Sequence, residues 1–148
     1  MKQQNISKNY LSELEIKPLD YPLETGVIAE IGSGLPIIAL RADIDALPIV
    51  ERTNLDYASS NGAMHACGHD FHQTSLLGAA EILKEREAEL NGTIRLIFQP
   101  AEENFQGGYK VIEAGGLENV SAIIGYHNNP HLKPRSNWIT LRCNYGRG

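Results

Sequence analysis

The sequence predicts an α/β protein in which a mainly parallel sheet lies between helices in three layers. Three observations predict this class: short β-branched runs, longer segments with apolar residues at helical spacing, and the alternation of the two from residue 70 onward. Alternating helices and strands favour parallel pairs joined by right-handed crossovers. The 148 residues, of which 42% are hydrophobic and 21% charged, suit one globular domain with a real core.

The N-terminal third predicts one helix and two strands. Residues 7–16 carry apolar side chains at helical spacing, which indicates a short amphipathic helix. Residues 26–32 and 35–42 are β-branched runs joined through Gly32-Ser33-Gly34. This spacing predicts two strands that pair with each other through a tight turn.

A long loop and a regular alternation of elements follow. Residues 43–69 are rich in Asp, Pro, Asn, Ser and Gly, and so long a loop inside a domain is usually functional. After it the sequence predicts a helix ended by Asn-Gly, a strand stopped by Pro100, a short helix and a further strand, at residues 70–90, 93–99, 107–114 and 121–127.

Composition excludes several classes of function. The formal net charge is −5 without a basic cluster, so nucleic acid and anionic membranes are poor partners. No apolar run reaches the roughly 18 residues that span a bilayer, and the N-terminus lacks the apolar core of a signal peptide. The two cysteines, Cys67 and Cys143, could in principle form a disulfide, but nothing indicates secretion, which favours a reducing cytoplasm.

Ligand-type side chains gather at the predicted carboxyl ends of the strands, the edge at which open α/β sheets bind ligands. These side chains come from four segments: Asp43 and Asp45; His65, Cys67 and His69; Glu102 and Glu103; and His127. Acids collected without cationic partners repel one another unless cations lie among them. A divalent metal therefore explains the set.

Each residue alone also has a structural interpretation. Asp43 and Asp45 could cap a turn, Glu102 and Glu103 could be solvated, His127 could be a structural histidine, and Cys67 a small buried hydrophobe. The joint arrangement favours the metal. Thiolate, imidazole and carboxylate together suit zinc, manganese, cobalt or nickel better than calcium or magnesium. One adjacent glutamate can bind metal while the other takes a proton from water, which is the apparatus for hydrolysing an amide or ester.

Four motifs resemble one known family. RADIDALP (41–48), MHACGHDFH (64–72), FQPAEE (98–103) and GYHNNP (125–130) are similar to those of the aminoacylases, hippurate hydrolases and indole-acetyl-amino-acid hydrolases among the dinuclear metallopeptidases of group M20. The resemblance runs from about residue 10 to residue 134. It implies a metal-dependent amidohydrolase that acts on N-acyl amino acids or small peptides with two divalent ions, manganese or zinc, or else cobalt or nickel.

The resemblance also implies roles for individual residues. Metal ligands would be Cys67, His69, Glu103 and His127, and Glu102 would be the general base that activates water. Asp45 matches the aspartate behind the metal site. Asp43 stands where related branches carry a metal-binding histidine, which leaves its own ligand role open. His65 and His72 belong to the motif as structural or supporting residues rather than ligands.

The chain departs from the family in length and at its end. Family members are more than twice as long and have a further histidine ligand and an inserted domain that dimerises and contributes to substrate binding. We therefore expect residues 1–134 to be the first part of a split catalytic domain. Residues 135–148 lack the resemblance. A back-translation of residues 135–147, with codons chosen freely among synonyms, gives a family-like sequence when its first base is dropped, which predicts an out-of-frame tail without an evolved role for Trp138 or Cys143.

Two alternatives to an active amidohydrolase follow from the sequence. The chain could be a catalytically silent fragment that binds metal weakly or not at all, and we expect the isolated chain to have little or no activity. An unrelated thiol protein could instead use Cys67 for redox chemistry, but the chain has no CxxC motif and a surplus of acids near this cysteine.

Overall fold

The computed structural model describes residues 2–129 and the backbone of residues 140–142. The predicted tail, residues 135–148, lies outside the described residues apart from one short strand. The helices are α1 (Lys2–Glu13), α2 (His69–Glu85), the 3-10 turn Glu87–Glu89 and α3 (Gly107–Glu113); the strands are β1 (Val27–Gly32), β2 (Ile37–Asp43), β3 (Thr93–Gln99), β4 (Val120–Gly125) and β5 (Thr140–Arg142).

One sheet contains these strands in the order β1-β3-β2-β4-β5. The pairs β2–β3 and β2–β4 are parallel, as the alternation of helices and strands predicts, and the outer pairs β1–β3 and β4–β5 are antiparallel. The sheet is therefore mixed, with a parallel centre.

The predicted pairing of the first two strands is wrong. β3 lies between β1 and β2: Val27 is opposite Phe98 on one side, and Ala42 is opposite Phe98 on the other. Because Phe98 is fully buried and five of the seven residues of β3 are buried, placing β3 inside the sheet buries more surface than a hairpin of β1 and β2 would. The short connection at residues 33–36 crosses the end of β3 instead of closing a hairpin.

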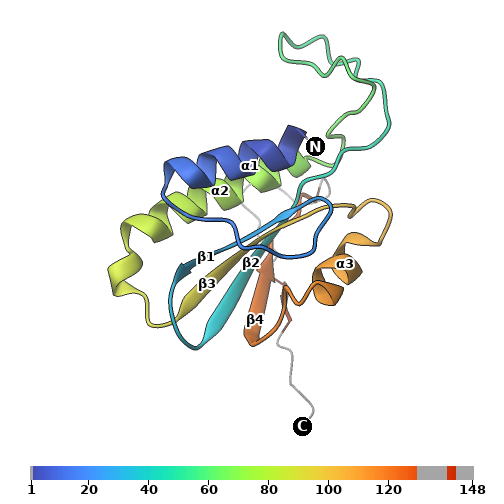
Figure 1. Ribbon diagram of the computed structural model, residues 1–148. Helices are drawn as coiled ribbons and strands as arrows, with labels where there is room; N and C mark the ends of the chain where they lie inside the picture. The colour runs from blue at the N-terminus through green and yellow to red at the C-terminus, as the bar shows by residue number, and fades with distance from the viewer. Residues whose placement is uncertain (1, 130–139, 143–148) are drawn as a thin grey trace.

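Helices cover both faces of the sheet, as Figure 1 shows. Helices α1 and α2 lie side by side on one face, where Leu11, Leu76 and Ala80 pack with the apolar side chains of β1 and β3. Helix α3 covers the other face, and its Val111 packs against Ile28 and Ile97. The predicted three-layer α/β/α class is confirmed. No helix among the described residues is long and apolar enough to cross a bilayer.

The helices begin and end away from their predicted limits at two places. Helix α1 begins at Lys2, five residues before the predicted start, and α2 ends at Glu85, after which a 3-10 turn continues to Glu89. In α1 the residues of the first turn, Lys2–Asn5, are all polar, so apolar spacing could not mark it.

The long loop leaves the sheet at the carboxyl end of β2. Residues 44–68 extend past the N-terminal end of α1 and return to α2 (Figure 1). Its two arms are joined by the reciprocal backbone hydrogen bonds of Leu47 and Met64. The loop therefore delivers residues 65–69 to the same sheet edge that β2, β3 and β4 reach.

Candidate metal centre

His69 is the first residue of α2 and lies at the middle of the site. It follows Gly68, whose left-handed backbone (φ 79°) turns the chain into the helix. Its ring is 1% exposed, and Nδ1 lies 3.0 Å from the carbonyl oxygen of Asp45. Because a carbonyl only accepts, Nδ1 carries the proton and Nε2 presents a lone pair. Among the described residues, this buried Nε2 has no hydrogen-bond partner.

Carboxylate oxygens surround this free nitrogen. Nε2 of His69 lies 3.7 Å from Glu103 Oε1 and 3.8 Å from both Glu102 Oε2 and Asp43 Oδ2. These distances are too long for hydrogen bonds. They match the roughly 3.3 to 3.8 Å that separates two ligands of one tetrahedral metal with bonds of about 2.0 to 2.3 Å. The unpartnered nitrogen and its distances therefore fit a metal ion.

Cys67 joins His69 and Glu103 in one group of potential ligands, whose ligand atoms all lie within 4.8 Å of one another. The pKa of the Cys67 thiol is raised to about 11, first by its hydrogen bond to Glu103, then by burial and by the charges of Glu103, Glu102 and Asp43. Without a metal the cysteine is therefore a neutral thiol at pH 7. A bound cation would reverse this and favour the thiolate.

His127 follows β4 and belongs to a second group that shares His69. Its Nδ1 donates to the carbonyl oxygen of Asn128 at 2.9 Å, which leaves Nε2 with a lone pair, 3.9 Å from Asp43 Oδ2. The ring centroids of His69 and His127 are 5.6 Å apart. The four residues proposed as ligands from the sequence thus fall in two overlapping groups, Cys67–His69–Glu103 and Asp43–His69–His72–His127, the second of which also contains Asp43 and His72.

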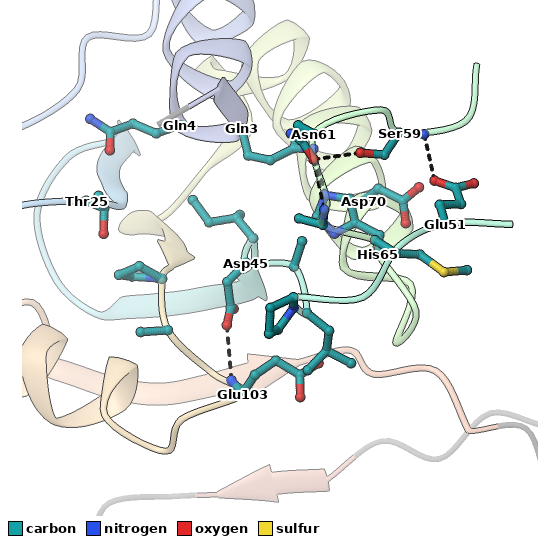
Figure 2. Close-up of a pocket in the computed structure, with 18 of the residues that line it drawn as sticks. Gln3, Gln4, Thr25, Asp45, Glu51, Ser59, Asn61, His65, Asp70 and Glu103 are labelled. Carbon is teal, nitrogen blue, oxygen red and sulfur yellow. Dashed lines mark hydrogen bonds between the residues drawn. The ribbon is translucent and has the colours of Figure 1, made fainter.

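Asp45 lies behind the glutamates and holds their backbone. Its Oδ1 accepts the amide of Glu102 at 3.0 Å. Its Oδ2 accepts the amide of Glu103 at 3.1 Å, as Figure 2 shows. The residue before them, Ala101, has a positive φ of 54°, so the chain turns sharply here. Asp45 therefore fixes both glutamates through their amides and His69 through its own carbonyl.

His72 is buried one turn along α2 from His69, and both of its ring nitrogens have protein partners. Nδ1 lies 2.5 Å from Asp43 Oδ1, and Nε2 accepts the backbone amide of Asn128 at 2.9 Å. Although burial raises the pKa of Asp43, the hydrogen bond from His72 and the charge of Arg41 outweigh it, so the pKa is lowered. Burial lowers the pKa of His72 in turn. His72 is thus neutral, and we do not propose it as a ligand although it lies within the second group.

His65 lies outside both groups. Its Nε2 lies 2.7 Å from Nε2 of Gln3, at the wall of a hollow between α1 and the long loop. Figure 2 shows Glu51, Asn61 and Asp70 on the same side of this hollow, and Asp45 and Glu103 on the other. This placement agrees with a structural role at the base of the loop.

The sequence model of peptidase family M20/M25/M40 matches residues 39–140. The chain belongs to this family. It is 59% identical over 129 residues to an N-acetylcysteine deacetylase of Bacillus subtilis, with 84% of this chain and 34% of the relative covered. It is 58% identical over 105 residues to the IAA-amino acid hydrolase ILR1-like 5 of Arabidopsis thaliana, with coverages of 70% and 24%.

Solved M20 structures agree with the fold. A Bacillus subtilis protein described as a dinuclear metal-binding peptidase of family M20 superimposes with a TM-score of 0.83 at 57% identity, covering 88% of this chain and 38% of that one. The resemblance inferred from the four motifs is therefore confirmed. The chain spans about a third of the length of the curated relatives it matches.

Sequence reasoning missed two residues of this M20 site. Arg41 forms an ion pair with Asp43 at 2.7 Å, and Asn128 connects His72 to His127. Both lie inside the four motifs, within two residues of candidate ligand positions. Alternation along a strand places Arg41 and Asp43 on one face, so their ion pair could have been predicted from the sequence. Asn128 acts through its main chain, and its residue type gives no indication of that role.

Proposed function

We propose that this chain carries the metal-binding and water-activating part of an amidohydrolase that cleaves the amide bond of N-acyl amino acids or small peptides. The observation that carries the proposal is the buried, unpartnered Nε2 of His69, with carboxylate oxygens of Glu102 and Glu103 at 3.8 and 3.7 Å. Such a nitrogen is costly to bury unless a ligand completes it.

In this proposal Cys67, His69, Glu103 and His127 would hold the divalent ions. The metal would supply Lewis-acid chemistry by lowering the pKa of water and polarising the substrate carbonyl. Manganese and zinc suit the mixed thiolate, imidazole and carboxylate set, and cobalt and nickel are further candidates. A free thiol ligand in Cys67 is consistent with a reducing cytoplasm.

Glu102 is the proposed general base. Its amide is fixed by Asp45, and its carboxylate is about one-third exposed, so it reaches both the site and solvent. Glu102 would take one proton from the attacking water and deliver it to the nitrogen of the leaving amine. The carbon–oxygen bond forms first, and the carbon–nitrogen bond breaks once its nitrogen has received the proton, so that the products are a carboxylic acid and a free amino acid.

The substrate class is inferred from relatives. A deacetylase of N-acetylcysteine and a hydrolase of IAA-amino acid conjugates both act on an amide that joins an acyl group to an amino acid. We infer a small N-acyl amino acid as the substrate here. A second candidate is a catalytically silent fragment with weak or no metal binding, which is favoured by the coverage of only about a third of the relatives' length.

The test combines metal content with hydrolysis. The chain is loaded with manganese or zinc, bound metal is measured by elemental analysis, and amine release from acetyl- and benzoyl-amino acids is followed. Glu102→Gln should retain metal and lose about 10²- to 10⁴-fold in rate. Glu85→Gln, at an exposed position at the end of α2, is the matched control and should change neither.

The outcomes separate the two candidates. Metal binding together with hydrolysis that depends on Glu102 and is abolished by a chelator supports the amidohydrolase. Metal binding without hydrolysis, or the absence of both, supports the silent fragment. Hydrolysis that Glu102→Gln leaves intact would overturn the role of Glu102.

A further inference from the structure

Asp43, at the end of β2, and His72, on α2, form a buried pair beside His69. Both side chains are fully buried, and Nδ1 of His72 lies 2.5 Å from Oδ1 of Asp43. Nε2 of His72 accepts the backbone amide of Asn128 at 2.9 Å, so the proton of the neutral ring is on Nδ1 and is donated to Asp43. Both ring nitrogens of His72 thus form hydrogen bonds within the protein, which fixes one tautomer of the ring.

Asp43 is itself fixed by β2. Arg41, two residues earlier on the same strand, places Nη1 2.7 Å from Oδ2 of Asp43 and donates through Nε to Gln99 Oε1 at 3.0 Å. The carboxylate charge is therefore compensated within the protein. Oδ1, which accepts the proton of His72, is thereby held in place as an anchor for the His72 ring.

Asn128 binds the opposite side of the His72 ring from Asp43. Its amide is held by His72, its Oδ1 accepts the hydroxyl of Tyr126 at 3.0 Å, and its side chain lies over Gly68. A Cβ on Gly68 would lie 2.2 Å from Nδ2 of Asn128, so only glycine leaves room for this side chain. Gly68 stands between Cys67 and His69, and the contact ties the two ligand-bearing segments together.

The carbonyl oxygen of Asn128 completes the connection, because it accepts Nδ1 of His127 at 2.9 Å. The residue whose amide is held by His72 thus also orients the ring of His127. We propose that His72, anchored by Asp43, is a positioning residue that fixes Asn128 and thereby directs Nε2 of His127 into the metal centre. The expected effect on metal binding rests on the proposed function. The hydrogen bonds that connect Asp43, His72, Asn128 and His127 belong to the chain without metal.

Two substitutions separate the two ends of the His72 ring. Asparagine can reproduce the donor at Nδ1 and glutamine the acceptor at Nε2. His72→Asn should therefore keep the bond to Asp43 and release Asn128, whereas His72→Gln should keep Asn128 held. Nitrogen-15 NMR of the histidine rings and hydrogen exchange of the Asn128 amide report directly on these bonds in the metal-free chain.

In the unsubstituted chain we expect His72 and His127 each in the tautomer protonated at Nδ1, and a protected Asn128 amide. His72→Asn should increase the exchange rate of Asn128 and remove the single tautomer of His127, and His72→Gln should restore both. An unsubstituted His72 protonated at Nε2, or a folded His72→Asn chain with unchanged Asn128 and His127, overturns the proposal. The tautomer of His72 in the unsubstituted chain tests the proposal even when His72→Asn does not fold.

Cobalt(II) binding, followed by its visible absorption, tests the consequence. His72→Asn should weaken cobalt affinity about 10- to 100-fold, the usual effect of removing a partner behind a metal ligand, and His72→Gln should stay close to the unsubstituted chain. Equal affinity in the Asn and unsubstituted chains overturns the role at the metal. If the unsubstituted chain binds no cobalt, the proposed function fails for this chain, while the NMR result still decides whether His72 positions His127.

Discussion

Asp43 and Asp45 stand two residues apart at the end of β2, yet their surroundings differ. Asp43 is fully buried and bonded to side chains, His72 and Arg41. Asp45 is 20% exposed and bonded to backbone amides, those of Glu102 and Glu103. The difference shows how two neighbouring acids can divide one site: Asp45 holds the segment after β3, and Asp43 holds the segment after β4 through His72 and Asn128.

The largest effect on stability should come from Asp43→Ala. This change leaves buried His72 and the largely buried Arg41 without their shared partner, and we expect the free energy of unfolding to fall by about 3 kcal/mol, measured by urea denaturation. Asp43→Asn, which keeps an oxygen for His72, should lose less. A loss from Asp43→Ala no larger than that of an ordinary surface substitution would contradict the anchoring role.

A smaller effect is expected from Asp45→Ala, because Asp45 is partly hydrated and its partners can reach water. Loss of its two amide bonds should lower the free energy of unfolding by about 2 kcal/mol. Hydrogen exchange sharpens the comparison. The amides of Glu102 and Glu103 should lose protection in Asp45→Ala and keep it in Asp43→Asn, while the Asn128 amide should remain protected in Asp45→Ala. Equal loss at all three amides in both variants would show that the two aspartates do not act separately.

Two glycines with nearly equal backbone angles provide the next test. Gly68 has φ 79° and a Cβ position blocked by Asn128, whereas Gly62 has φ 81° and open space around it. Gly62→Ala should destabilise the chain by only the left-handed strain, about 1 kcal/mol. Gly68→Ala should lose more, because Asn128 must also move, and thermal unfolding measures the difference. Equal losses would mean that the Asn128 contact adds nothing.

The smallest effect concerns the thiol on the Asp45 side of the site. Because the pKa of Cys67 is raised to about 11, its alkylation by iodoacetamide in the metal-free chain should be slow at pH 7 and accelerate as pH rises toward 11. Glu103→Gln removes the nearest charge and the carboxylate acceptor, so it should lower this pKa and speed alkylation severalfold at pH 8. Glu102→Gln, which removes only a more distant charge, should have a weaker effect. Rapid alkylation of the unsubstituted chain at pH 7 would contradict the raised pKa.

Local signals predicted the elements well. Residues 93–99 form β3, and the short helix predicted at 107–114 is α3 over Gly107–Glu113. Both could be predicted because the apolar residues of an element and the glycine or proline that bounds it lie within the same short segment. The pairing of the strands could not be predicted from local sequence in the same way. A short glycine-containing connection fits a hairpin, and nothing in residues 26–42 reports that Phe98 will lie between the two strands.

The site shows the same division. Residue types at strand ends and in the long loop predicted a set of side chains that would meet. His69 does lie among Glu102, Glu103 and Asp43, whereas His65 from the same set lies outside both groups. The supporting bonds depend on which ring nitrogen carries a proton, and that depends on three-dimensional neighbours. His72 shares a helix face with His69 three residues earlier, so the sequence placed it near the site, but only the structure connects it to Asn128.

The insertion of β3 between β1 and β2 has a consequence for the order in which the chain can fold during synthesis. Val27 pairs with Phe98, and both neighbours of β2 in the sheet come later in the sequence. The ribosome must therefore release about two-thirds of the chain before any pair of long strands can form. Until then β1 and β2 remain open edges with apolar faces, and topologies with such distant contacts fold slowly and are exposed to aggregation. Helix α1, which needs only local hydrogen bonds, is the first element that the emerging chain can make.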